Sequence, residues 1–129
     1  MDRNDFIAGV QKYAQLQSRE QALSATEAVL ETLGECLYRT ECNGLAAQLP
    51  KGIKELLFKK HPPEQSRREL DRISLEEFYN RVHARSELGY NAAVNASLAV
   101  ATVLKQAIAP GEIADAVAEL PSDLRQLFT

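Results

Sequence analysis

The sequence predicts an all-α protein, a helical bundle of two tandem pseudo-repeats of about four helices each. Three observations lead to this prediction. Apolar residues recur at steps of three and four along most of the 129-residue chain, as on the buried face of a helix. No alternating β-branched run and no Asn-Gly or Asp-Gly hairpin signal is present. One long stretch of the chain also occurs twice.

The repeated stretch aligns residues 22–57 with residues 93–128 at a constant offset of 71 positions and without a gap. The identical pairs are Ala22/Ala93, Ala25/Ala96, Ala28/Ala99, Val29/Val100, Leu33/Leu104, Glu41/Glu112, Ala47/Ala118, Leu49/Leu120, Pro50/Pro121 and Leu56/Leu127. Unrelated segments match at roughly one position in fifteen, so these matches indicate a duplicated helical unit. We therefore expect a single domain over 1–129, with repeat one at 5–58, a polar linker at 59–74 and repeat two at 75–129.

The first half contains signals for four helices. The first helix starts at a capping residue, Asp2 or Asn4. Its inward residues, at helical spacing, are Phe6, Val10 and Tyr13 or Ala14. Ser18 and Gln21 form a capping box for a second, central helix. The apolar stripe of that helix is Ala22, Ala25, Val29, Leu33 and Cys36 or Leu37.

A short third helix is expected over 41–48, with Thr40 as its N-cap. Pro50 ends that helix and opens the fourth, because proline lacks the amide that a continuing helix needs but suits a first turn. The inward residues of these two helices are Leu45, Ala46, Leu49, Ile53, Leu56, Leu57 and Phe58.

The second half repeats this order. Ser74 and Glu77 form a capping box for a helix that is expected to end at Gly89 in the left-handed C-cap conformation. The apolar face of that helix is Phe78, Val82 and Leu88. A central helix over about 92–109 follows, and Pro110 breaks it before a short helix over 112–119. Pro121 opens the last helix, whose inward residues are Leu124, Leu127 and Phe128.

Composition places the chain among ordinary soluble proteins, with 45% hydrophobic and 26% charged residues. A net charge of −3 argues mildly against a protein made mainly to grip nucleic acid or anionic lipid. No window approaches the roughly 20 apolar residues that span a bilayer, and the first residues contain no signal-peptide run. We expect a cytoplasmic protein with no membrane partner.

Basic residues concentrate in the middle of the chain. Residues 51–85 carry nine basic and six acidic side chains, whereas the flanking parts are acidic. The candidate interaction surface in this region is Lys59, Lys60, Arg67, Arg68 and Arg72. The simpler interpretation is that residues 51–85 form a solvated connector, since the interleaved acidic residues cancel most of the positive electrostatic field.

No residue pattern indicates catalysis, a cofactor or a metal site. Cys36 and Cys42 align with apolar residues of the other copy, which is typical of small buried thiols. His61 and His83 have no partner at a metal-ligand spacing, and nothing in the sequence pairs with His61. Glu41 is the only charged residue that the repeat keeps identical, at Glu112, and a carboxylate in a first helical turn is favoured by the helix dipole.

Several sequence motifs resemble one bacterial family. They are the AT-x-AVL-x-TL helix (residues 25–33), the LAAQLP segment (45–50), the EEF helix start (76–78) and the closing GE…LP…LR-x-LF (111–128). This pattern is similar to the family catalogued as domain of unknown function 2267, over nearly the whole chain. The resemblance implies a small all-helical protein of tandem repeats. It implies no known activity, cofactor or catalytic residue.

We expect a non-enzymatic module that binds an unidentified protein partner or a second copy of itself. The alternative is a weak nucleic-acid binder that uses the basic residues of 51–85, with a helix–turn–helix over 41–58 as a possible reading element. The second copy of that element lacks the matching basic face, which argues against this alternative. An enzyme of unrecognised type is the third hypothesis.

Overall fold

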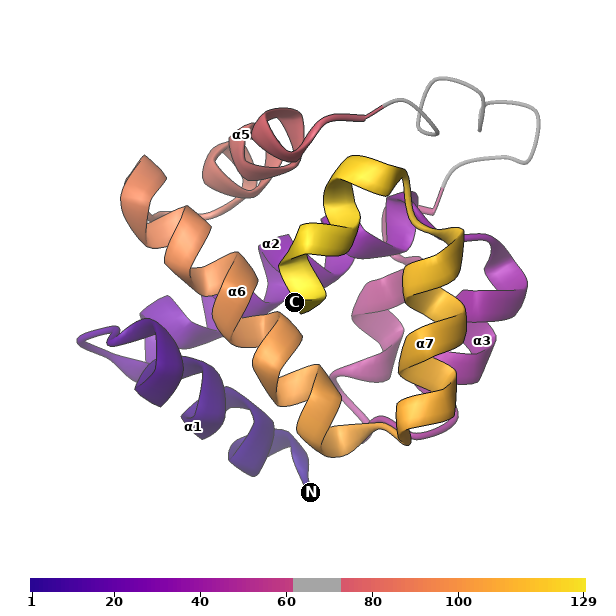
Figure 1. The fold of residues 1–129 in the computed structure, drawn as a ribbon. Helices are drawn as coiled ribbons and strands as arrows, with labels where there is room; N and C mark the ends of the chain where they lie inside the picture. Colours follow the sequence, from indigo (N-terminus) through magenta and orange to yellow (C-terminus); the bar gives the residue numbers. More distant parts are fainter. Residues whose placement is uncertain (62–72) are drawn as a thin grey trace.

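The computed structural model describes residues 1–61 and 73–129, and all of its regular elements are helices (Figure 1). In chain order they are α1 (Arg3–Ala14), α2 (Arg19–Glu35), α3 (Arg39–Ala46), η1 (Lys54–Phe58), α5 (Leu75–Arg85), α6 (Tyr90–Ala107), α7 (Pro110–Glu119) and η3 (Ser122–Phe128), where η marks a 3-10 helix. No strand occurs in these two ranges, so the predicted all-α fold is confirmed.

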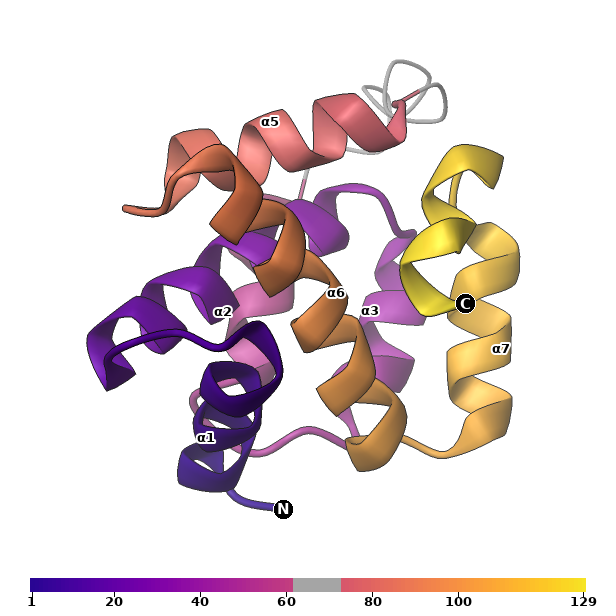
Figure 2. The ribbon, with the colours of Figure 1, turned by 60° about the vertical axis from the view of Figure 1, so that its left-hand side comes forward.

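The two long helices, α2 and α6, contact each other at the centre of the molecule (Figure 2). Helix α1 packs against both of them, and so does α5. The short helices α3 and α7 pack against each other, while η1 lies on α2 and η3 lies on α6. The first helix of each half therefore crosses to the central helix of the other half, and both halves share one interior.

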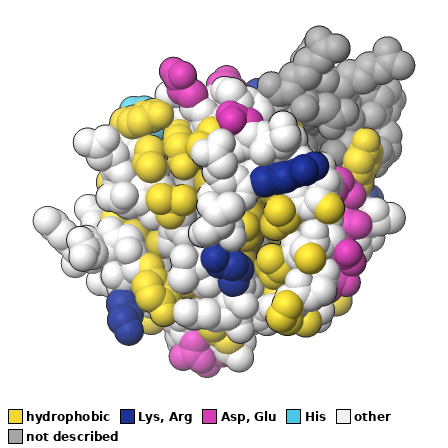
Figure 3. All heavy atoms as spheres, viewed as in Figure 1, with side chains coloured by type: hydrophobic (Ala, Val, Ile, Leu, Met, Phe, Trp, Pro, Cys, Tyr) yellow, Lys and Arg dark blue, Asp and Glu magenta, His cyan; other side chains and the backbone are white. Residues whose placement is uncertain are grey.

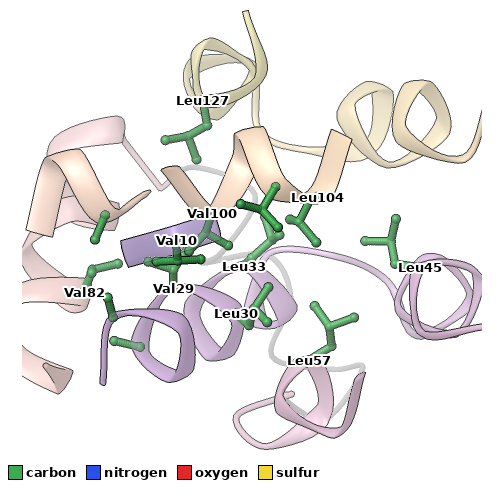
Figure 4. Packing of buried hydrophobic residues seen from close by; sticks show 14 of the residues in the cluster. Val10, Val29, Leu30, Leu33, Leu45, Leu57, Val82, Val100, Leu104 and Leu127 are labelled. Atoms are coloured by element: carbon green, nitrogen blue, oxygen red, sulfur yellow. The ribbon is translucent and has the colours of Figure 1, made fainter. Parts of the chain in front are cut away.

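The shared interior contains the apolar stripes that the sequence predicts. Leu33 and Leu104 are only 2% and 1% exposed. Figure 4 shows both leucines, with Val29 and Val100, between the two central helices. The same order of elements occurs in both halves, but the structural equivalence of the halves stays a prediction.

Three of the predicted helix starts are capped by the expected side chains. Asp2 caps α1 in a capping box with Asp5, and the Ser74 hydroxyl accepts a hydrogen bond from the Glu77 amide of α5 at 3.0 Å. The Ser18 hydroxyl likewise accepts from the Gln21 amide at 3.1 Å. The Gln21 side chain, however, accepts from the Gln17 amide, so the predicted capping box at Ser18 is only half right.

Two predicted caps are wrong. The N-cap of α3 is Tyr38 and not Thr40, so this helix begins at Arg39, two residues earlier than expected. Helix α5 ends at Arg85, and Gly89 instead precedes α6 as its N-cap with a φ of −66°, which is not left-handed. The chain bends away after Arg85, which leaves Leu88 buried outside the helix.

The elements that follow Pro50 and Pro121 are 3-10 helices, whereas Pro110 is the first residue of the α-helix α7. Pro50 is followed by a turn before η1 begins at Lys54, so it does not open the next helix directly as the sequence predicted. Pro121 is the N-cap residue of η3. Most of the predicted linker over 59–74 lies outside the described residues.

Candidate functional site

Of the five basic residues of the predicted interaction surface, the structure places two. Lys59 and Lys60 are exposed at the end of η1. Lys59 makes an ion pair with Glu31 of α2, at 3.3 Å between Nζ and the carboxylate oxygen. Arg67, Arg68 and Arg72 lie outside the described residues. The structure therefore does not test whether the five form one surface.

Two other basic residues of 51–85 are used to join helices. Arg85 donates to the Glu35 carboxylate and, at 2.9 Å, to the Thr32 hydroxyl, while Arg81 approaches the same carboxylate at 3.5 Å. The Glu35 side chain is only 13% exposed. This cluster joins α5 to α2. The Glu35 carboxylate also offsets part of the positive charge that Arg81 and Arg85 give to residues 51–85.

Both histidine rings lie next to backbone carbonyl oxygens, and both cysteines are buried. His61 Nε2 lies 3.1 Å from the Leu37 carbonyl oxygen, which corrects the expectation that nothing pairs with this ring. His83 is exposed, as predicted, and its Nδ1 lies 2.8 Å from the Leu88 carbonyl oxygen. Cys36 and Cys42 are buried in the core, as the sequence predicted.

Within residues 1–61 and 73–129, no three His, Cys, Asp or Glu side chains gather closely enough to hold a metal ion. The same ranges contain no helix with the length and apolar character that crossing a membrane requires.

The pKa values of Glu55 and Tyr79 are shifted from their ordinary values. The Glu55 carboxylate accepts hydrogen bonds from backbone amides, its own and that of Gly52, and these lower its pKa. Burial raises the pKa of Tyr79, with smaller contributions from Tyr90 and Asp123. Neither shift creates a catalytic acid or base in a cleft.

An apolar groove of about 580 Å³ lies beside α7. Helix α7 supplies its apolar wall through Pro110, Ile113, Ala114, Val117 and Ala118. These positions follow helical spacing and form one open face of α7, while Ala116 is buried on another. Figure 3 shows hydrophobic side chains over α7, with basic side chains beside them and acidic ones along the outer edge.

The groove continues onto η3 and α6, which add a second apolar surface and two cations. Phe128 is half-buried there, and Lys105 and Arg125 lie at the rim. Lys105 Nζ donates to the Phe128 carbonyl oxygen at 3.4 Å, and Arg125 donates to the Ala118 carbonyl oxygen at 3.0 Å. Among the described residues, no carboxylate oxygen lies within 4.0 Å of either cation.

The aligned residues Gly34 and Lys105 make different contacts with the 3-10 helix of their half. In the first half, a Cβ atom on Gly34 would lie 1.8 Å from the Leu57 carbonyl oxygen, so η1 rests directly on the backbone of α2. The residues 71 positions later are Lys105 and Phe128. A lysine side chain cannot fit into such a contact, so it reaches the corresponding carbonyl oxygen from its tip, and η3 leaves open space beside α7.

Burial of the aligned side chains agrees with this explanation. Cys42 and Leu57 are both 0% exposed, whereas their counterparts Ile113 and Phe128 are only half-buried in the groove wall. The sequence patterns did not predict this groove. The Gly34/Lys105 difference is visible in the sequence, but the periodicity of apolar residues does not report its effect on packing.

These features describe a small all-helical protein with an open apolar groove beside α7. A model of the protein family described as "Uncharacterized conserved protein (DUF2267)" matches residues 3–127. The chain therefore belongs to this family, as the sequence motifs predicted. No curated protein matches the chain.

Proposed function

We propose that the protein is a non-enzymatic interaction module and that a partner protein docks in the groove between α7 and η3. The observation that supports this most is the open apolar face of α7. Side chains such as Ile113 and Val117 stabilise a protein when they are removed from water, and here they are only half-buried. Exposed apolar grooves with a polar rim are typical of interaction sites.

A photo-crosslinking amino acid placed in the groove tests this proposal. Ala118 lies in the groove wall, and the aligned residue of the first half, Ala47, is equally exposed but lies outside it. We expect crosslinked protein adducts in the source cell from position 118 and none from position 47. Val117→Glu places a charge in the groove and should abolish the adducts.

The outcome that contradicts the proposal is equal crosslinking at both positions, or no adduct at position 118. Circular dichroism of Val117→Glu should match the parent, which shows that the fold survives the substitution. A mass measurement of the adduct distinguishes another protein from a second copy of the chain.

Nucleic-acid binding through 51–85 stays the alternative, with less support among the described residues. Lys59 pairs with Glu31, and the Glu35 carboxylate takes up the guanidinium groups of Arg81 and Arg85. Binding to random duplex DNA at low salt that weakens steeply as salt rises would favour this alternative over the groove. The groove proposal expects no such binding.

A further inference from the structure

We infer that the groove binds one acidic, amphipathic helix of a partner protein. This inference rests on the proposed function and specifies the chemistry of the partner. It depends on three features of the groove: its apolar wall, its shape and the two cations at its rim.

The apolar wall and its dimensions fit a short helical segment. Helix α7 presents Ile113 and Val117 one turn apart, so the wall offers contacts at the spacing of a partner's i and i+4 side chains. A helix of ten residues such as α7 is about 15 Å long, which matches about three turns of a partner. The volume of about 580 Å³ takes a few large side chains and not a whole domain.

Two other modes of peptide binding lack their structural requirements here. Strand addition needs an exposed sheet edge, and the described ranges contain no strand. Proline-rich segments dock against walls of several aromatic rings, whereas Phe128 is the only aromatic side chain in this lining. Of these three modes, a helix laid against α7 is the one that the groove supports.

The two cations at the rim of the groove favour a partner with negative charge. Lys105 and Arg125 donate to neutral backbone carbonyl oxygens, and in the described structure neither has a carboxylate within ion-pair distance. A partner that covers the groove removes water from both cations. Partner Glu or Asp side chains then supply charge-assisted hydrogen bonds, whereas a basic partner would bury like charges together.

Peptide display provides a test that separates this inference from the proposed function. A displayed library of random 16-residue peptides is selected on the intact chain, then counter-selected on Val117→Glu to keep only groove-dependent binders. Ala47→Glu, which adds the same charge outside the groove, is the matched control and should retain every binder. We expect the groove-dependent peptides to combine apolar residues at i, i+3 or i+4 with Asp and Glu.

Charge reversal completes the test. The selected peptides should bind the double variant Lys105→Glu, Arg125→Glu at least about tenfold more weakly than they bind the parent. Versions of these peptides with Lys in place of Glu should bind the double variant more tightly than the original peptides do. Groove-dependent peptides without acidic enrichment, or with unchanged affinity for the double variant, would overturn the inferred chemistry but leave the interaction module standing. If no groove-dependent peptide is selected, the proposed function itself fails.

Discussion

The side-chain oxygen of Gln48 accepts a hydrogen bond from the backbone amide of Ala109 at 2.6 Å. The reverse contact also exists, because the Glu119 carboxylate accepts from the backbone amide of Tyr38. Tyr38 and Ala109 are 71 positions apart, and so are Gln48 and Glu119. A side chain after α3 thus accepts from the amide before α7, and a side chain at the end of α7 accepts from the amide before α3. A twofold relation between the halves would produce this pair of reciprocal contacts.

Removing either acceptor should destabilise the protein by a similar amount. Gln48→Ala and Glu119→Ala each leave a helix-entry amide without its side-chain partner, at a cost of about 0.5–2 kcal/mol. Urea unfolding followed by circular dichroism measures both values. Glu119→Gln keeps an acceptor oxygen and should retain most of the stability. Costs that differ widely between the two alanine variants would argue against the twofold relation.

Large-to-small substitutions in the central helices should destabilise the whole molecule. Leu33→Ala and Leu104→Ala each remove buried methyl groups and leave a cavity, which costs about 2–5 kcal/mol. Because the two leucines lie in one interior, each variant should show one unfolding transition at a lower midpoint. Leu98→Ala, at a side chain that is 41% exposed, is the control and should change little. Two separate transitions would contradict the prediction of a single domain.

Gly34→Ala should be severely destabilising. The added methyl group meets the backbone of η1 at Leu57, which cannot rotate away as a side chain can, so we expect a loss of about 3 kcal/mol or more. Gly111→Ala is the matched control, because nothing lies within 4 Å of its added methyl group. Thermal unfolding of both variants checks the prediction. Equal stability of the two would show that η1 does not rest on α2.

Stability should fall in alkaline solution as Tyr79 ionises. Its folded pKa is raised from 10.0, mainly by burial, so the folded protein holds this proton more tightly than the unfolded chain. The contribution is fully present below pH 10 and is lost as pH rises through the folded pKa. Tyr79→Phe should lose less stability between pH 9 and pH 11 than the parent, as measured by urea unfolding at each pH. Parallel curves for the two proteins would contradict this prediction.

The helices and their buried faces were predictable because they depend on local sequence. Steps of three and four identified the stripe that contains Leu33, and short-range hydrogen bonds identified the caps at Asp2, Ser18 and Ser74. The start of α3 was not predictable in this way. Thr40 is a good N-cap in isolation, but the structure extends the helix to Arg39, where a carboxylate from α7, 81 positions away, holds the preceding amide.

The groove was hidden for a similar reason. Its existence depends on how closely a 3-10 helix approaches a central helix, and the periodicity of apolar residues does not report that distance. The relevant contact joins Gly34 to Leu57 in one half and Lys105 to Phe128 in the other. The predicted basic surface had a different limitation, since three of its five residues lie outside the described ranges.

The tight contact at Gly34 also affects which amino-acid substitutions the chain tolerates. In the first half of the chain, side chains such as Cys42 are fully buried, so nearly any replacement there endangers folding. The aligned Ile113 borders open space, so larger or smaller apolar residues fit there at little expense to the native state. The position of Cys42 is therefore constrained by packing, whereas the position of Ile113 tolerates apolar substitution.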